Sequence, residues 1–185
     1  SQFPQGHGLA YAWLGPLIGA LIRPLGGWLS DKLGGAKVTF WIFAVMASGA
    51  AGVLAFLPQT GHGGNFYGFL AMFMLLFIAA GIGNGSTFRM IPAIFLQERL
   101  RQAAAADGAD EEQVARDANT ESAAALGFSS AVGAFGGFFI PMSYGASISM
   151  TGTAQSALYL FIVFYLTCIA MTWWCYLRRG ARFLV

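Results

Sequence analysis

The sequence predicts an all-α membrane protein with five transmembrane helices, and three observations support this prediction. The chain of 185 residues is 57% hydrophobic and 10% charged, and its mean hydropathy of +0.62 lies above the range of soluble globular domains. Five apolar segments follow one another, each close to the roughly 20 residues of helix that cross a bilayer core of about 30 Å. The polar residues gather in the connections between these segments.

The five predicted spans cover residues 9–30, 38–57, 66–92, 122–142 and 157–177. Each is long enough to cross the bilayer once and too short to cross it twice. The long connection at about 96–121 is rich in Ala, Glu and Arg, so we expect it to hold a short surface helix. Pro92 is expected to kink or end the third span, because proline has no amide hydrogen. Asn119 or Thr120 is expected to cap the start of the fourth span.

The charged residues lie almost entirely on one side of the predicted membrane. Five spans place successive connections on alternate sides, and all acidic residues fall on the same side as most basic ones. These basic residues are Lys32, Lys37, Arg99, Arg101, Arg116, Arg178, Arg179 and Arg182. By the positive-inside rule this side is cytoplasmic, and the C-terminus lies there too. We therefore expect a multi-pass protein of the cell inner, or plasma, membrane, in contact with the lipid bilayer. The net charge of +2 is too small to indicate nucleic-acid binding.

Arg23 lies inside the first span, where an arginine costs at least about 2.5 kcal/mol on insertion and so needs a physical reason. At about 100° per residue, Arg23 shares one helical face with small residues, namely Ala12, Gly15, Gly19, Gly26 and Ser30. Membrane helices approach one another or line a path along such faces. The alternative is that Arg23 snorkels to the cytoplasmic interface about 12 Å away. That distance and the small face favour an interior, functional position.

Two other spans bring small or polar residues to a similar depth. The fourth span has a stripe of small residues: Ala123, Gly127, Ser130, Ala134 and Gly137. Ordinary helix packing is the alternative explanation for this stripe. Gly127 and Arg23 lie about 7 Å and 4 Å from the midpoints of their spans, so we expect both to border one central site. The third span contributes Asn84 at a similar depth, whereas Arg89 lies nearer the cytoplasmic end, where snorkelling explains it at least as well.

Enzyme chemistry finds little support in the sequence. His7 and His62 lie in glycine-rich connections without a metal-ligand partner in spacing, and no carboxylate lies at membrane depth. The cluster Asp110, Glu111 and Glu112 has no His or Cys nearby and is interpreted as a solvated acidic face. We therefore predict no catalytic residue, no metal site and no cofactor.

Two motifs resemble known transporter signatures. "GGWLSDKLGGAK" resembles the cytoplasmic loop motif of the major facilitator superfamily, with matches at Gly27, Leu29, Asp31, Lys32 and Gly34. It departs from that motif at Gly35 and Ala36, where basic residues are usual. "GFSSAVGAFGGFFIP" resembles the glycine-rich signature of nitrate/nitrite porters of the NarK type, with Gly127, Gly133, Gly136 and Gly137 as signature glycines. "GNGSTFRMIP" and "AALGF" are similar to the same family, and the resemblance covers essentially the whole chain.

This resemblance implies that residues 1–185 form part of a C-terminal transmembrane half, with spans that correspond to helices eight to twelve of a twelve-helix porter. It implies that Arg23 and Gly127 contact the substrate, and we place Asn84 and Ser130 beside them. The loop motif of Gly27, Asp31, Lys32 and Gly34 is expected to serve gating. The implied function is secondary transport of nitrate and/or nitrite by alternating access, in nitrate assimilation. The expected partners are nitrate, nitrite, lipid and the missing N-terminal half.

The chemistry of these residues is consistent with that function. The oxygens of planar nitrate match a bidentate guanidinium, and glycines let the backbone approach a small flat ion. Exchange of nitrate for nitrite by an antiporter needs no intramembrane carboxylate, and these spans contain none. Proton symport through groups in the missing half is the alternative coupling. The alternative functions are a major facilitator for another small anion or an organic acid, and a structural five-helix membrane protein.

Overall fold

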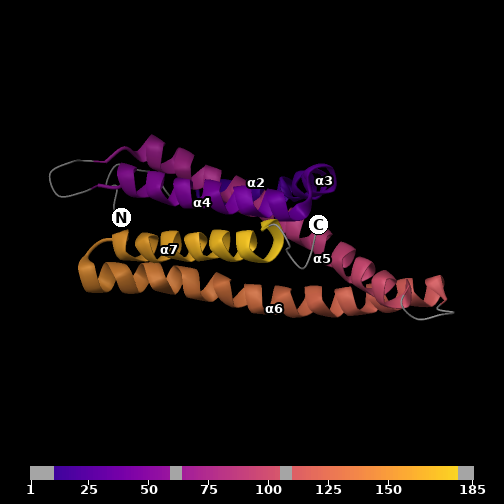
Figure 1. The fold of residues 1–185 in the computed structure, drawn as a ribbon. Helices are drawn as coiled ribbons and strands as arrows, with labels where there is room; N and C mark the ends of the chain where they lie inside the picture. Colours follow the sequence, from indigo (N-terminus) through magenta and orange to yellow (C-terminus); the bar gives the residue numbers. More distant parts are fainter. Residues whose placement is uncertain (1–10, 59–63, 105–109, 179–185) are drawn as a thin grey trace.

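The computed structural model describes residues 11–58, 64–104 and 110–178, which are almost entirely helical and contain no strand. The helices are α2 (Leu14–Leu21), α3 (Arg23–Leu33), α4 (Gly35–Phe56), α5 (Phe66–Ala104), α6 (Glu111–Thr151) and α7 (Gln155–Thr172), followed by a π-helical turn, η1 (Trp173–Leu177). Figure 1 shows the axes of α4, α7 and α6 nearly aligned, with α7 running opposite to α6, while α5 slants across them and meets the start of α6 at one end of the molecule. The predicted all-α fold is confirmed.

The predicted first span forms two helices in place of one continuous helix. α2 ends at Leu21 and α3 begins at Arg23, with Ile22 as the turn between them. Pro24 explains this break, because it has no amide hydrogen to donate to the carbonyl of Ala20 one turn earlier. Around the break, Leu25 and Gly26 both donate their amides to the carbonyl of Ile22, at 3.1 and 3.3 Å. Arg23 therefore stands at the first position of a helix that follows a break.

Four helices in the described ranges are long and apolar enough to cross a membrane: Gly35–Phe56, Phe66–Ala104, Glu112–Thr151 and Gln155–Leu177. α2 and α3 have 8 and 11 residues, so neither crosses a bilayer alone. The first predicted span, residues 9–30, corresponds to this broken pair. Together these helices make the chain a multi-pass membrane protein.

α5 and α6 are longer than the spans predicted from hydropathy. α5 has 39 residues and continues through Pro92, and α6 has 41 residues. In place of a separate surface helix at 96–121, the described parts of that connection belong to the end of α5 and the start of α6. α6 is capped by Asp110, whose Oδ1 accepts the amide of Glu112 at 3.0 Å, so the expected cap at Asn119 or Thr120 was wrong. The helix ends at Gly152, whose φ of 73° suits glycine.

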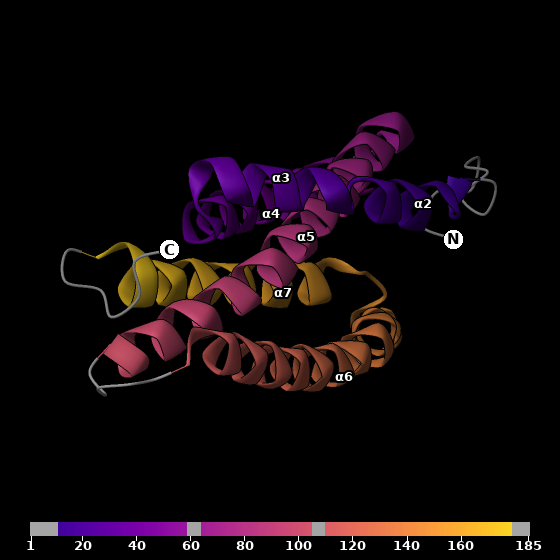
Figure 2. The same ribbon diagram turned by 90° about the vertical axis from the view of Figure 1, so that its right-hand side faces the viewer.

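The small face of α2 and α3 packs directly on α5. A Cβ at Gly26 would meet the backbone of Ile82, and a Cβ at Gly85 would meet the carbonyl oxygen of Arg23. Only glycine allows the two helix backbones to approach this closely. Figure 2 shows α5 running diagonally between α3 and α4 on one side and α6 on the other. A separate apolar cluster joins α4 to α7 through Val53, Leu54, Leu57 and Leu158.

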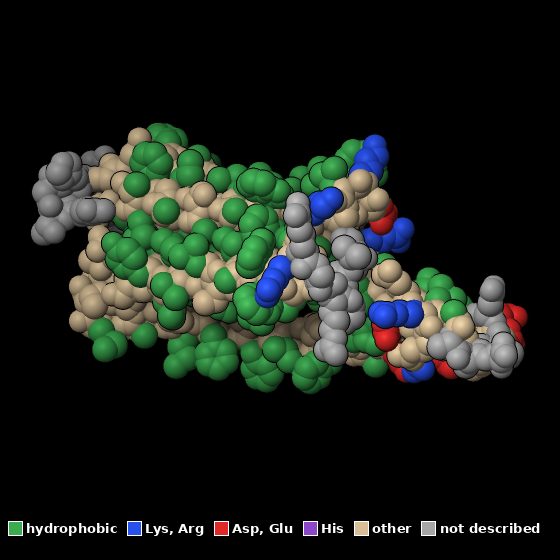
Figure 3. Space-filling model, viewed as in Figure 1, with side chains coloured by type: hydrophobic (Ala, Val, Ile, Leu, Met, Phe, Trp, Pro, Cys, Tyr) green, Lys and Arg blue, Asp and Glu red, His purple; other side chains and the backbone are tan. Residues whose placement is uncertain are grey.

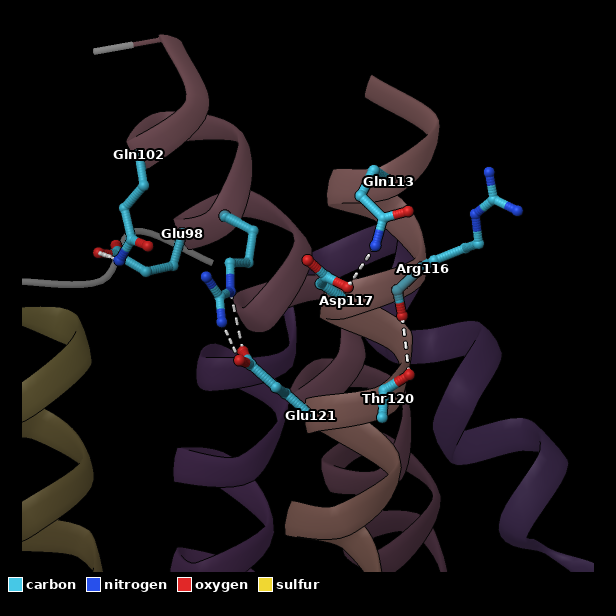
Figure 4. Close-up of polar contacts among 8 residues, drawn as sticks. Glu98, Gln102, Gln113, Arg116, Asp117, Thr120 and Glu121 are labelled. Atoms are coloured by element: carbon cyan, nitrogen blue, oxygen red, sulfur yellow. Dashed lines mark hydrogen bonds and ion pairs between the residues drawn. The ribbon is translucent and has the colours of Figure 1, made fainter. Parts of the chain in front are cut away.

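Polar contacts hold α5 and α6 together at the end where they meet. Arg99 of α5 donates from Nε to Glu121 Oε2 at 2.9 Å and from a terminal nitrogen to Glu121 Oε1. Figure 4 labels Glu121 and marks its contacts with dashed lines. Within α6, Arg116 forms an ion pair with Glu112 at 3.3 Å. A guanidinium that binds both oxygens of a carboxylate fixes direction as well as distance. The Arg99–Glu121 pair therefore links the two long helices near the end where they meet.

Candidate functional site

A cavity of about 600 Å³ is lined by residues of α3, α4, α5 and α6. Its polar lining consists of Arg23, Thr39, Asn84, Thr87, Ser129 and Ser130. Three of the four residues predicted to bind substrate, Arg23, Asn84 and Ser130, thus line one space although they come from three helices. None of the residues that line it is acidic. A space of this size with few polar groups in an apolar wall is typical of a small-molecule site.

Helical periodicity explains how α4 and α5 present side chains to this cavity. Thr39, Ile42, Phe43 and Met46 of α4 lie three, four and seven positions apart, so they share one face of the helix. On α5, Gly83, Asn84 and Thr87 follow the same spacing. Two amphipathic faces therefore form most of the wall, and α3 adds a single charged group.

Arg23 differs from three other helical arginines in its electrostatic surroundings. Arg89 pairs with Asp31, Arg99 with Glu121, and Arg116 with Glu112. Arg23 makes no ion pair or hydrogen bond with any side chain in the described part of the chain, and it is exposed to the cavity. A guanidinium without a counter-ion in an apolar wall attracts an anion, and its fork suits two oxygen atoms.

Thr39 is a cavity residue that the sequence did not single out. Its Oγ1 is buried and has no hydrogen-bond partner among the described residues. Thr87, in the same wall, donates to the carbonyl of Gly83 one turn earlier at 2.9 Å. The corresponding acceptor for Thr39 is the carbonyl of Gly35, which instead receives the hydroxyl of the fully buried Ser86 at 3.4 Å. Thr39 therefore keeps a hydroxyl that a bound oxygen acceptor could use after rotation about χ1.

A second cavity, of about 460 Å³, lies against the other side of Arg23. Arg23, Asn84 and Phe88 line both cavities and so form the partition between them. Gly27 and Arg89 line only the second one.

The loop motif forms the end of α3 and the turn into α4. Gly34 has a φ of 87°, a conformation that residues with a Cβ rarely adopt, which explains the glycine at this position. Asp31 accepts two hydrogen bonds from Arg89 Nε, at 2.9 and 3.2 Å. Lys32 lies over the ring of Trp28, with 4.2 Å from Nζ to the ring centroid. The motif thus contacts α5 through Asp31 and makes a tight turn through Gly34.

The signature glycines of α6 lie mostly away from these cavities. Gly133 lines the first cavity, whereas Gly127, Gly136 and Gly137 line neither. A Cβ at any of the four would meet no atom of the described chain within 4 Å. These four glycines therefore do not pack against the other described helices, so packing within this part of the chain does not explain them.

Metal chemistry has no candidate in the described ranges, where no three His, Cys, Asp or Glu side chains group around a common point. His7 and His62 lie outside these ranges. The described members of the acidic cluster have other roles, because Asp110 caps α6 and Glu112 pairs with Arg116.

Comparison with known proteins gives close relatives over nearly the whole chain. No protein-family model matches it. The chain is 49% identical over 179 residues to the nitrate/nitrite transporter NarU of Escherichia coli, a match that covers 97% of this chain and 38% of the relative. It is 48% identical to NarU of Salmonella typhimurium, over 98% of this chain and 39% of the relative. It is 31% identical to the probable nitrate/nitrite antiporter NarK2 of Thermus thermophilus, over 94% of this chain and 34% of the relative.

The chain spans less than two fifths of the length of these curated relatives. A sequence identity near one half over almost the whole chain is far more than a shared membrane fold requires. The names of the relatives agree with the transporter families that the motifs at 27–34 and 127–141 resemble. The chain is therefore similar over nearly its whole length to proteins named as nitrate/nitrite transporters.

Proposed function

We propose that this chain is part of a secondary transporter that moves nitrate and/or nitrite across the inner membrane by alternating access. The main support is Arg23, an arginine without a described counter-ion in a cavity that it shares with Asn84 and Ser130. Relatives named as nitrate/nitrite transporters support the choice of anion. In this proposal Arg23 binds two oxygens of the anion, and Asn84 and Ser130 donate to the third oxygen of nitrate.

The absence of acidic residues from the cavity lining supports an exchange mechanism. Nitrate is the anion of a strong acid, so the protein cannot neutralise it by protonation. During exchange the transporter changes conformation with an anion bound to the positive site. A second anion, nitrite in this proposal, occupies the site while the transporter returns to its first conformation. The relative from Thermus thermophilus is named a probable antiporter, which agrees with this coupling.

The proposed orientation places the C-terminus in the cytoplasm. On the face shown in Figure 3, the Lys, Arg, Asp and Glu side chains gather in the central and right-hand parts, and the left-hand part shows apolar and neutral surface. The ends of α3 and α5 and the start of α6 carry these charges. A one-sided distribution of basic residues is typical of the cytoplasmic face.

The rest of the transporter is the proposed partner of α6. The relatives are more than twice as long as this chain, and the small-residue stripe of α6, which includes Gly127 and Gly137, offers a face without bulky side chains. We propose that the N-terminal half packs there and completes the anion site, with Gly127 beside the substrate.

Exchange in proteoliposomes tests this function. The full-length porter that carries this sequence is reconstituted with internal nitrite, and uptake of labelled nitrate is measured against competing nitrite, chloride and formate. We expect nitrite to compete strongly and chloride and formate weakly. Competition by formate as strong as that by nitrite would instead favour a porter for small organic acids.

A further inference from the structure

Arg89 holds its counter-ion through only one of its three nitrogens. Both contacts to Asp31, at 2.9 and 3.2 Å, come from Nε. The terminal nitrogens make no hydrogen bond with any residue that the structure describes. The side chains of Arg89 and Asp31 are 66% and 50% exposed, so water and solutes reach the pair. One end of this guanidinium is therefore free to bind an oxygen-bearing anion.

The second cavity places Arg89 next to the central site. Arg23 and Arg89 both line it, together with Asn84 and Phe88. Arg89 lies five positions after Asn84 on α5, which is about 7.5 Å along the helix axis toward the charged end of the molecule. An anion that leaves Arg23 past Asn84 thus finds a second arginine within one to two helical turns.

We propose that Arg89 is a second anion-binding station between the central site and the cytoplasm, with Asp31 as its competing counter-ion. This inference rests on the proposed function and assigns Arg89 the same ligand, a small planar oxyanion such as nitrate. A path for ions needs sites that attract the ion and also release it. Arg23 has no described counter-ion and binds tightly, whereas Asp31 offsets the charge of Arg89 and keeps the second station weak.

The alternative role for this ion pair is a lock that only holds α3 against α5. The two roles differ in what each substitution does to anion binding. In a lock, Asp31→Asn and Arg89→Gln break the same contact and have the same effect. In a station, Asp31→Asn removes a competing anion and strengthens nitrate binding, whereas Arg89→Gln removes the ligand and weakens it.

Equilibrium nitrate binding and nitrate/nitrite exchange by the full-length porter test the proposal. The variants are Asp31→Asn, Arg89→Gln and the exchanged pair Asp31→Arg with Arg89→Asp. An exposed pair contributes about 0.2–1 kcal/mol, so we expect Asp31→Asn to tighten nitrate binding about two- to fivefold and to slow exchange. Arg89→Gln should weaken binding by a similar factor. Glu112→Gln, in an exposed pair on α6, is the matched control and should change neither quantity.

The exchanged pair separates the two roles most clearly. It restores an ion pair between α3 and α5 but moves the cation to another helix, so we expect nitrate exchange to stay impaired. Recovery of exchange, or equal weakening of nitrate binding by Asp31→Asn and Arg89→Gln, would overturn the station. The gain in affinity expected for Asp31→Asn cannot result from misfolding. If the parent porter neither binds nor exchanges nitrate, the proposed function fails and this inference fails with it.

Discussion

Arg23→Lys tests whether the central arginine recognises the shape of the anion or only supplies charge. The substitution keeps the positive charge and most of the insertion cost, and it replaces a planar fork with a point charge. Arg23 has no ion pair in the described chain to lose, so the change should leave folding almost untouched. Each charge-assisted hydrogen bond contributes about 1.5–3 kcal/mol, so losing one should weaken nitrate binding about tenfold to a hundredfold.

The assay is equilibrium nitrate binding to the purified full-length porter, together with its level in the membrane. Arg116→Lys is the matched control, because Arg116 lies on the exposed start of α6 in an ion pair with Glu112. That variant should bind nitrate like the parent. Nitrate affinity of Arg23→Lys within about twofold of the parent would refute the reasoning, because it would mean that Arg23 supplies charge near the interface and does not grip the anion.

Three further substitutions test the walls of the site. Thr39→Val removes the hydroxyl that has no described partner and should weaken nitrate binding about threefold to tenfold, and Thr39→Ser should restore the binding. The control is Thr172→Val, because the Thr172 hydroxyl donates to its own helix at 2.7 Å. Gly127→Leu should abolish nitrate uptake and leave the protein level in the membrane unchanged; normal uptake would mean that the stripe faces lipid. Gly85→Val should lower the thermal stability of the porter by about 1–3 kcal/mol or more, because its side chain would meet the carbonyl of Arg23, and an unchanged melting temperature would contradict this contact.

Hydropathy and helical depth predicted much of the arrangement from the sequence. The apolar spans, together with the depths of Arg23, Asn84 and Ser130 in them, were enough to place these three residues near one another, and all three line one cavity. Their role in binding stays a prediction. Depth alone does not fix direction, because two residues at one depth can point different ways. Gly127 lines neither of the two cavities, and its place beside the substrate stays a prediction.

Other features depend on contacts between distant residues. The Thr39 hydroxyl has no described partner because Ser86 donates to the carbonyl of Gly35, which would otherwise accept from Thr39. Ser86 and Gly35 are 51 positions apart in the chain. The partition at Asn84 and Phe88, and the pairing of Asp31 with Arg89, likewise require α3 to be packed on α5. The helix break at Ile22 is different, because Pro24 is a local signal for it. A hydropathy average over the whole span does not detect a single proline. At Pro92 the same signal is overridden, since α5 continues through it.

The two glycine faces of this chain show why a small-residue stripe cannot be interpreted from sequence alone. On α3 and α5, Gly26 and Gly85 each face the backbone of the other helix, so their lack of a side chain is explained by the described chain itself. On α6, Gly127 and Gly137 face open space, and the same residue type remains unexplained there. A pattern of glycines indicates that some group approaches the helix backbone closely, but it does not identify that group. Substituting one glycine on each face separates the two cases. Gly85→Val should destabilise the fold, whereas Gly127→Leu should leave the stability of the fold unchanged and abolish transport.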